Sequence, residues 1–505
     1  MTLDQLPVLV ILIPLLTAPL IVLIRTPAVV RLMAIAAAAA SAFCAAMLVA
    51  RVGEPISYHM GGWTPGIGIE LRATKASAFV LALVTGIATV ALLLGTRGTR
   101  LDVRGTSDRS DATGGQRSRE HLYYAAFLTC LVGLCGMVIT GDAFNVFVFL
   151  EISSLSTYAL VAMGPRRRAF SAAFNYLVLG TIGGTFVLIG IGLLYQMTGT
   201  LNGPAISARI QEIGDPRTLH VAFGFLFVGF AIKLAVFPLH QWLPNAYAES
   251  PSAVSSFLAG TATKVIYFQL IRICLVVFGA DYVFGTLHFG SILGPLSLLG
   301  MFAGSLAAIY QLSLKRLLAY SSIGQVGYLT LALSLGTEDG LNAGLLHLGA
   351  HGITKTGLFL LASVIIAHVG TDRLASLNGL GKRMPLVAFL FVVGGIGLIG
   401  VPGTAGFVSK WALLQAALAG DHLMLAGAVL VSSLLAVMYV WRVVEVMYFR
   451  EPPEGAPLRV GYDWGALAPA GLLLGLSIAA GLYSEPICVY MRSAAAQLFV
   501  GGGAP

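Results

Sequence analysis

The chain contains 505 residues, of which 57% are hydrophobic and only 10% are charged, and its mean hydropathy is +0.88. Soluble domains carry about 25% charged residues, so this composition excludes an ordinary soluble protein and indicates a polytopic membrane protein. The net charge of +8 does not indicate a nucleic-acid surface, because the arginines lie in short loops rather than along one helix face.

Hydropathy predicts an all-α membrane protein with about fourteen transmembrane helices, each near the ~20 apolar residues that cross a hydrocarbon core. The first span lacks a basic leader and a cleavage site, so we expect it to be retained as a helix. The long polar segment 97–120 is rich in Arg, Asp, Ser and Gly, which predicts a disordered loop. The predicted spans are 6–24, 28–50, 76–97, 121–139, 142–163, 170–197, 219–241, 253–279, 289–310, 314–335, 341–369, 386–417, 422–447 and 464–484.

Two of these spans carry helix breakers beside a lysine, and their positions suggest an internal repeat. Pro238 follows Lys233 in the seventh span, and Pro402 precedes Lys410 in the twelfth. An offset of five spans reverses the direction of each helix, which is the pattern of two inverted five-helix repeats with broken helices near the midplane. The alternative for either helix alone is a proline kink with a snorkelling lysine. The predicted regions are a three-helix region at 1–120, repeats at 121–280 and 289–447, and a C-terminal helix and tail at 448–505.

The distribution of basic residues predicts the orientation. Loops after odd-numbered spans hold most of the Lys and Arg residues, so the positive-inside rule places them in the cytoplasm and both termini on the outer face of the plasma membrane. The basic residues assigned to the cytoplasmic side include Arg166, Arg167, Arg168, Lys315, Arg316, Lys382 and Arg383, whereas the opposite loops hold Arg51, Arg72, Lys75, Arg209 and Arg217.

Five ionisable side chains lie in the middle of predicted spans. Each costs ~2.5 to 3.5 kcal/mol at the bilayer centre, so the five together carry a penalty on the order of 12 to 17 kcal/mol. Such groups normally face a bundle interior, where they pair and mark the path of an ion or a proton. They are Glu151, Lys233, Lys264, Lys355 and Lys410.

The eleventh span adds two histidines to this set. His347, His351 and Lys355 recur every four residues, so they project from one face of a helix about 6 Å apart along its axis. Imidazoles that titrate near neutrality, followed by an amine, suit a proton wire. The same histidine spacing also suits zinc, but no further ligand accompanies it and the five cysteines show no ligand spacing, so we predict no metal and no cofactor.

Two of the lysines allow a structural as well as a functional interpretation. Glu151 needs a cation if it is ionised in lipid, and Lys233 is its natural partner across the bundle. Breaking that pair would favour release of a proton from the lysine, yet a purely structural salt bridge would look the same in sequence. Lys264 in the eighth span either relays charge between the seventh and eleventh spans or holds the bundle together.

Several long motifs, in order, resemble the antiporter-like subunits shared by Mrp-type multisubunit Na+/H+ antiporters, respiratory complex I and membrane-bound hydrogenases. The motifs are Thr140–Asn145 running into Glu151, Lys233–Pro251, Lys315–Tyr328 and His347–Leu360. The resemblance extends from about 121 to 420 and implies a fourteen-helix core with paired half-channels. It also implies that Glu151 and Lys233 form the first charged pair, that Lys264 and the histidine row form the central relay, and that Lys410 is the exit.

Within the family, the length, Lys410 and the run Tyr195–Asn202 are most similar to the D-type subunit of the Mrp-type antiporter. Three features depart from the family pattern. Gly403 stands where a second proline is common, the third span begins with the basic segment Leu71–Ala76 where an acidic residue is usual, and the 97–120 loop is long.

We therefore predict a membrane subunit that moves protons along a midplane row and couples them to Na+ or K+ exchange within a larger complex. The alternatives are the proton-pumping arm of an NADH:quinone oxidoreductase or membrane-bound hydrogenase, and a scaffold whose polar row is inactive. The chain carries no redox ligands of its own, so the first two possibilities differ only in the partner subunits.

Overall fold

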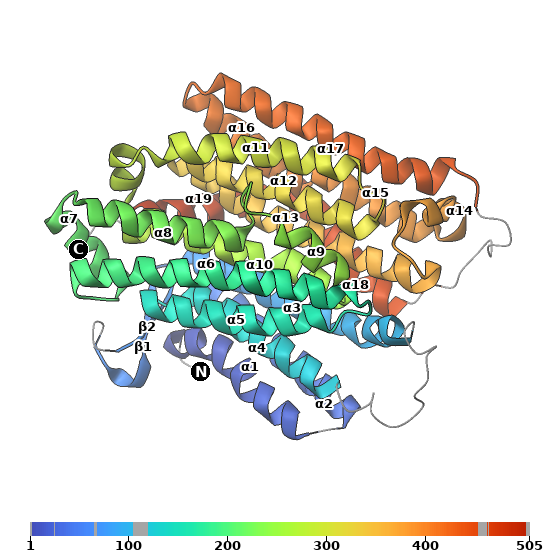
Figure 1. The fold of residues 1–505 in the computed structure, drawn as a ribbon, viewed down its shortest axis with the longest axis horizontal. Coiled ribbons are helices and arrows are strands. Elements are labelled where there is room, and N and C mark those ends of the chain that lie inside the picture. Colours follow the sequence, from blue (N-terminus) through green and yellow to red (C-terminus); the bar gives the residue numbers. More distant parts are fainter. Residues whose placement is uncertain are drawn as a thin grey trace.

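The computed structural model describes residues 3–24, 26–64, 68–104, 120–452, 462 and 464–500. Long helices run side by side across the molecule, with α1 and α2 along one edge and α16 and α17 along the opposite edge (Figure 1). The described residues are almost entirely helical, as the composition predicts. The helices are α1 (Leu6–Leu23), α2 (Pro27–Arg51), α3 (Lys75–Arg104), α4 (Glu120–Ile139), α5 (Ala143–Ala162), α6 (Arg168–Thr198), α7 (Gly203–Ile213), α8 (Arg217–Leu234), α9 (Trp242–Glu249), α10 (Ser252–Arg272), α11 (Phe289–Ile309), α12 (Leu314–Ser334), α13 (Glu338–Val369), α14 (Leu380–Arg383), α15 (Pro385–Ile399), α16 (Ala405–Ala419), α17 (Leu423–Phe449), α18 (Trp464–Leu482) and α19 (Glu485–Val500).

Within the described ranges, eleven helices are long and apolar enough to cross a membrane, and the bent pair α18 and α19 brings the number to twelve. The chain is therefore a multi-span integral membrane protein. Two predicted spans correspond to helices outside this set: 314–335 corresponds to α12, which is less apolar, and 386–417 corresponds to α15 and α16, which have 15 residues each. The count of fourteen and the inverted repeats stay predictions.

Helices extend into two regions that the sequence predicted as a loop and a tail. Helix α3 continues to Arg104, so the predicted 97–120 loop is wrong at its start, and residues 105–119 lie outside the described part. Helix α19 replaces most of the predicted tail and bends back at 83° to α18. Polar contacts with the start of α3 hold α19 in place: Gln497 accepts a hydrogen bond from the Lys75 amide, and Tyr490 donates one to the Lys75 carbonyl. A hydropathy profile does not detect such contacts.

The loop between α2 and α3 forms a short antiparallel hairpin of β1 (Ile56–His59) and β2 (Glu70–Ala73). Glu70 is buried there, and its carboxylate accepts hydrogen bonds from Ser57 and Asn202. These contacts join the hairpin to the start of α7, where Asn202 also caps the helix by accepting from the Ala205 amide. The hairpin and α7 thus cover one end of the bundle.

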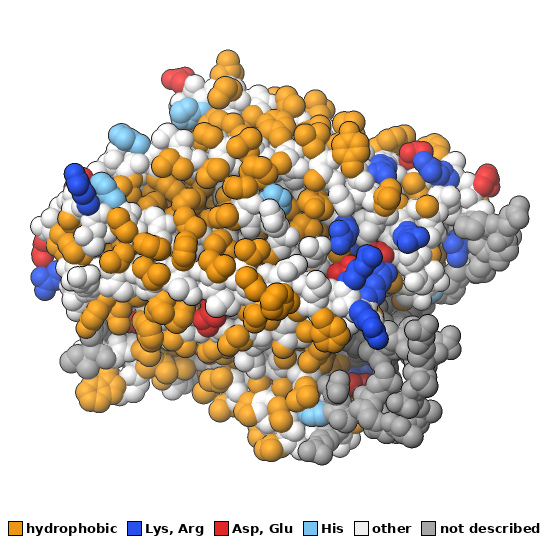
Figure 2. All heavy atoms as spheres, in the orientation of Figure 1, with side chains coloured by type: hydrophobic (Ala, Val, Ile, Leu, Met, Phe, Trp, Pro, Cys, Tyr) orange, Lys and Arg blue, Asp and Glu red, His pale blue; other side chains and the backbone are white. Residues whose placement is uncertain are grey.

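Burial separates the helices into an inner and an outer group. In α4, α10 and α13 between 72% and 83% of the spanning window is buried, whereas in α6 and α17 the value is 39% and 33%. The outer helices expose large apolar side chains, including Phe170 at 66% and Leu434 at 66%, and hydrophobic atoms cover most of the visible face in Figure 2. The polar residues of α10 and α13 therefore face protein rather than lipid.

Basic residues gather around an open bowl at one end of the molecule, visible as the blue side chains toward the right in Figure 2. Asp372 organises this end: its Oδ1 lies 3.2 Å from Arg166 Nη2, and its other oxygen accepts a hydrogen bond from the Ser313 hydroxyl. Seven arginines line the bowl, namely Arg166, Arg167, Arg168, Arg316, Arg373, Arg442 and Arg450.

Candidate functional site

The first charged pair joins α5 to α8. Lys233 Nζ lies 3.5 Å from Glu151 Oε1, and the two side chains are 4% and 25% exposed. This distance exceeds the ~2.7 to 2.9 Å of a charge-assisted hydrogen bond, so the attraction is mainly electrostatic. The ammonium is held more closely by hydroxyl groups, because it donates to Ser154 Oγ at 2.6 Å and to Tyr158 OH at 3.3 Å.

A glycine on α6 makes the room that the carboxylate occupies. A Cβ atom placed at Gly184 would lie 2.2 Å from Glu151 Oε1, which is well inside van der Waals contact. Any larger side chain at this position must displace the carboxylate from Lys233. The close approach of α6 therefore sets the geometry of the pair.

The end of α8 positions Lys233 beside a helix break. The helix ends at Leu234, and Ala235 adopts the left-handed conformation with φ of 63°. The chain then turns through Pro238 before α9 begins at Trp242, whose indole nitrogen donates to the Ile232 carbonyl at 2.7 Å. This bond satisfies one of the carbonyl groups that the end of a helix leaves without an intrahelical partner.

Lys264 lies at the centre of α10 and is fully buried. Its ammonium donates to the Ala259 carbonyl and to Thr263 Oγ1, and no carboxylate among the described residues forms an ion pair with it. Helix α10 packs directly against α13, which carries His347, His351 and Lys355. The structure therefore brings Lys264 close to the row that the four-residue spacing predicted.

The α13 row is continuous and buried. The rings of His347 and His351 lie 6.0 Å apart with an interplanar angle of 12°, as expected for residues one helical turn apart. His347 Nδ1 hydrogen-bonds with Ser409 Oγ at 3.0 Å, whereas both ring nitrogens of His351 are buried without a hydrogen-bond partner in the described protein. Within those same ranges, no third metal-ligating side chain joins the two histidines.

Lys355 ends the row on α13 and contacts α12. It is fully buried and donates to the Leu318 carbonyl at 2.8 Å and to Ser321 Oγ at 2.5 Å. A serine hydroxyl can donate or accept, so Ser321 can hydrogen-bond with either the ammonium or the neutral amine. The site can thus accommodate a lysine in both protonation states.

The break between α15 and α16 positions Lys410. Helix α15 ends at Ile399, Gly400 and Gly403 have positive φ angles of 89° and 87°, and α16 begins at Ala405 after Pro402. Lys410 Nζ donates to the Leu398 and Ile399 carbonyls, each at 3.0 Å. The unwound end of α15 therefore supplies the acceptors for this buried ammonium, as helix breaks in transporters do.

Tyr328 and Ser433 connect Lys410 with the histidines. Lys410 Nζ lies 4.5 Å from the centroid of the Tyr328 ring and 3.2 Å from Ser433 Oγ, which itself hydrogen-bonds with Tyr328 OH at 3.2 Å. The Tyr328 ring is 5.5 Å from that of His347. Hydroxyls and imidazole therefore link α16 and α17 to α13 through α12.

An aromatic cluster occupies the region near Lys233. Tyr158 packs edge-on against Tyr176, and Tyr176 stacks on Trp242 with ring centroids 4.0 Å apart. Tyr247 follows at 6.5 Å from Trp242. Lys233 and Lys264 hydrogen-bond to different groups, Ser154 and Tyr158 for the first and Ala259 and Thr263 for the second.

We call the buried ionisable residues on α5, α8, α10, α13 and α16 the polar row. Sequence reasoning missed the hydroxyl groups that connect its members, because serine and tyrosine in a span do not stand out by charge or spacing. Three of these hydroxyl groups, those of Ser321, Tyr328 and Ser154, lie in or next to the motifs quoted above. Their position in the motifs was the one feature of the sequence that could have pointed to them. The polar row consists of Glu151, Lys233, Lys264, His347, His351, Lys355 and Lys410.

Comparison with known proteins places the chain among membrane subunits of two kinds. The family model described as "NADH:quinone oxidoreductase/Mrp antiporter, TM" matches residues 140–436. A curated relative, NADH-quinone oxidoreductase subunit N of Desulforudis audaxviator, is 37% identical, with 96% of this chain and 97% of the relative covered. The D-type subunit of the Na(+)/H(+) antiporter of Alkalihalophilus pseudofirmus is 29% identical, with 87% and 85% covered.

The fold agrees with these sequence relationships. A chain in the structure of the Mrp complex from Dietzia sp. DQ12-45-1b superposes with a TM-score of 0.89 at 26% identity. The match covers 99% of this chain and 98% of that chain. The similarity thus extends over the whole length, including the regions outside 140–436.

Proposed function

The chain belongs to the NADH:quinone oxidoreductase/Mrp antiporter family of membrane subunits, and on this premise we propose that its polar row carries protons sideways through the molecule. We further propose that it does so as a subunit of a multisubunit antiporter that exchanges Na+ or K+ for H+. The observation that carries the proposal is the burial of four lysines whose ammonium groups donate to neutral oxygens, with the Glu151 carboxylate as an additional neighbour of Lys233.

The surroundings of the lysines support a role in proton movement rather than a purely structural role in the helix bundle. Lys264, Lys355 and Lys410 form no ion pair with a described carboxylate, whereas a structural lysine in a bundle is normally paired. Carbonyl groups stabilise the ammonium, and hydroxyl groups hydrogen-bond with either the ammonium or the amine. Neutral His351 adds one proton-accepting nitrogen to the row, and neither of its ring nitrogens has a hydrogen-bond partner among the described residues.

Like-charge repulsion couples the members of the row. Lys264 lies on α10, which packs against α13, so a proton on Lys264 disfavours a proton on the neighbouring groups of the α13 row. At the other end, the Glu151 carboxylate favours the charged form of Lys233 as long as the pair stays closed. Separating the pair therefore favours transfer of the proton toward the centre of the molecule.

The basic bowl supports the proposed orientation. Its seven arginines lie at one end of the molecule, and by the positive-inside rule this end is cytoplasmic. Both termini then lie on the outer face of the plasma membrane. The bacterial origin of the antiporter relatives supports that membrane.

A larger assembly supports the same function. The relatives are named as subunits, and the matching chain in the Dietzia structure is part of an Mrp complex. We propose that other membrane subunits cover this chain and complete the cation path.

The second candidate is the proton-pumping arm of an NADH:quinone oxidoreductase. The observation that favours it is the 37% identity to NADH-quinone oxidoreductase subunit N, which exceeds the 29% identity to the D-type antiporter subunit. The same polar row would serve either assembly, because the energy source would reside in other chains.

Purification of the native assembly, followed by identification of its other chains, tests this choice. Small membrane subunits together with Na+- or K+-dependent collapse of a pH gradient in inverted vesicles are expected for the antiporter. Co-purifying flavin or iron–sulfur proteins would replace the antiporter by the redox pump. An assembly whose exchange is unaffected by mutation of the polar row would support the scaffold.

A further inference from the structure

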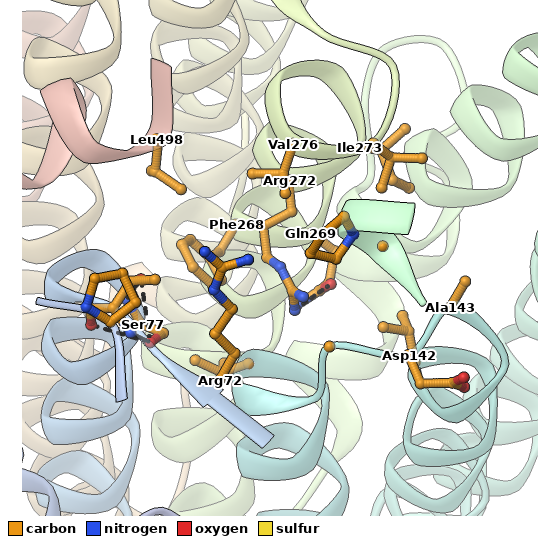
Figure 3. Close-up of a pocket in the computed structure, with 18 of the residues that line it drawn as sticks. Arg72, Ser77, Asp142, Ala143, Phe268, Gln269, Arg272, Ile273, Val276 and Leu498 are labelled. Carbon is orange, nitrogen blue, oxygen red and sulfur yellow. Dashed lines mark hydrogen bonds between the residues drawn. The ribbon is translucent and has the colours of Figure 1, made fainter. Parts of the chain in front are cut away.

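A second internal site lies away from the polar row, at the end of the bundle covered by the hairpin and α7. It is a cavity of about 600 Å³ between β2, α6, α8, α10 and α19. This size falls within the range of about 300 to 1,000 Å³ typical of ligand pockets. Figure 3 shows the arrangement of its polar residues.

Two arginines meet at this cavity from opposite sides. Arg72 extends from β2 and Arg272 from α10, so that their guanidinium groups point toward one another (Figure 3). Arg272 donates to the Met137 and Thr140 carbonyls at the end of α4, which fixes its position without neutralising its charge. No described residue accepts a hydrogen bond or forms an ion pair with the Arg72 side chain.

A third cation lies close by, at the start of α3. Lys75 donates to Ser493 Oγ at 2.5 Å, and that serine lines the cavity. Arg72 and Lys75 both belong to the short segment that leads from β2 into α3. Two cations of this segment thus lie at or next to the cavity.

The acidic residues nearby do not cancel these charges. Asp142 lines the cavity but caps α5 by accepting from the Asn145 amide, and Figure 3 shows its carboxylate directed away from the arginines. Glu70 interacts electrostatically with Arg272, yet its carboxylate is hydrogen-bonded to Ser57 and Asn202. These hydrogen bonds leave both carboxylates charged, so three cations and two carboxylates give a net positive charge at and beside the cavity.

The remaining wall of the cavity is apolar and comes from the lipid-spanning parts of α6, α8 and α10. This wall can accept hydrocarbon but offers no hydrogen bonds to a polar ligand. Its members include Val187, Ile191, Leu226, Phe268, Ile273 and Val276.

We propose that the cavity binds an anionic phospholipid, with the phosphate on Arg72 and Arg272 and an acyl chain along the apolar wall. Guanidinium groups bind phosphate oxygens in a bidentate manner, and basic pockets between membrane helices recognise anionic head groups. A lipid seated there contacts the hairpin, α10 and α19 together and stabilises their packing. This inference does not depend on proton translocation.

Native mass spectrometry of the purified full-length protein in detergent tests the proposal. Phosphatidylglycerol should bind at least about fivefold more tightly than phosphatidylcholine with the same acyl chains, since one cation near a head group contributes about that factor. Arg72→Gln should remove this preference, because Arg72 has no side-chain partner among the described residues to lose. Val276→Phe should weaken binding of both lipids by filling the apolar wall.

Arg209→Gln is the matched control: it makes the same change in charge on α7, at a side chain that is 61% exposed and outside the cavity. Glycerol phosphate should not bind measurably. Equal affinity of the wild-type protein for the two lipids, or an unchanged preference in Arg72→Gln, would overturn the proposal. Binding of glycerol phosphate as tight as that of the lipid would show a phosphate site and would overturn the lipid assignment.

Discussion

Replacing Glu151 with Gln should reduce cation-driven proton exchange at least about tenfold while the protein still assembles. The substitution keeps the size of the side chain and removes its charge from a position 3.5 Å from Lys233 Nζ. The ammonium then keeps only the hydroxyl groups of Ser154 and Tyr158 as partners. The Glu151–Lys233 pair, whose separation we propose to favour proton transfer, would lose its negative charge.

The size of the effect follows from the geometry. At an effective dielectric constant of about 20, two unit charges 3.5 Å apart attract by ~5 kcal/mol. A tenfold change in rate corresponds to about 1.4 kcal/mol. Less than a third of the electrostatic attraction therefore suffices for the predicted loss.

The assay is dissipation of a pH gradient in inverted vesicles on addition of Na+ or K+, with the complete assembly present. Glu445→Gln is the control, because it breaks an ion pair of similar length, Arg450 Nη2 to Glu445 Oε1 at 3.0 Å, whose side chains are 50% and 40% exposed. Exposed pairs contribute only about 0 to 1 kcal/mol, so this variant should exchange like the wild type.

Lys233→Ala should give the same loss as Glu151→Gln. Wild-type exchange in both variants, at equal amounts of assembled protein, would refute the role of the pair and favour a structural salt bridge. Loss of assembly in both variants and in the control would instead show a general folding defect. Exchange by Glu151→Gln would then be compared with that of the wild type per amount of assembled complex.

Gly184→Ala should also impair exchange, because its Cβ would lie 2.2 Å from the carboxylate of the pair, whereas Gly192→Ala on the same helix meets no atom within 4 Å and should exchange normally. Lys410→Ala and Lys410→Arg should lose exchange equally if proton release is required there; retained exchange in the Arg variant would show that charge alone suffices. Burial alone would raise the pKa of Asp372, but the neighbouring hydroxyl and guanidinium lower it below the ordinary carboxyl value. Asp372 therefore stabilises the folded protein at pH values above the pKa of its carboxyl group in the unfolded chain, and this contribution is lost as the pH falls through the pKa in the folded protein. Thermal melts of Asp372→Asn should differ from those of the wild type at pH 7 and converge with them in acid.

Much of the fold could be predicted because membrane spans have a strong local signal. The apolar runs that predicted 142–163 and 341–369 correspond to α5 and α13, and the breakers Pro238 and Pro402 lie in the turns after α8 and α15. The hairpin, α7 and α19 were missed because their stability depends on contacts with distant segments, such as the Lys75 and Gln497 bond, rather than on hydropathy.

The polar row could be predicted residue by residue, since a charge in an apolar span is costly wherever its helix is placed. Its connections could not, because they join helices far apart in the chain. Ser433 contacts Lys410 from α17, and Ser321 contacts Lys355 from α12. Neither serine differs in sequence from the many that only bond to their own helix.

By itself, the sequence determined that the chain spans a membrane, which side chains carry a desolvation penalty, and where two helices break, because these properties depend on composition and short-range spacing. Only the tertiary structure decided that Lys233 meets Glu151 while Lys264 faces the α13 row, and that Arg72 meets Arg272 at a separate cavity. The reason is physical: hydrogen bonds and direct ion pairs form only when their heavy atoms lie about 3 to 4 Å apart, so they depend on which helices pack together. Helix packing is not encoded in any one span.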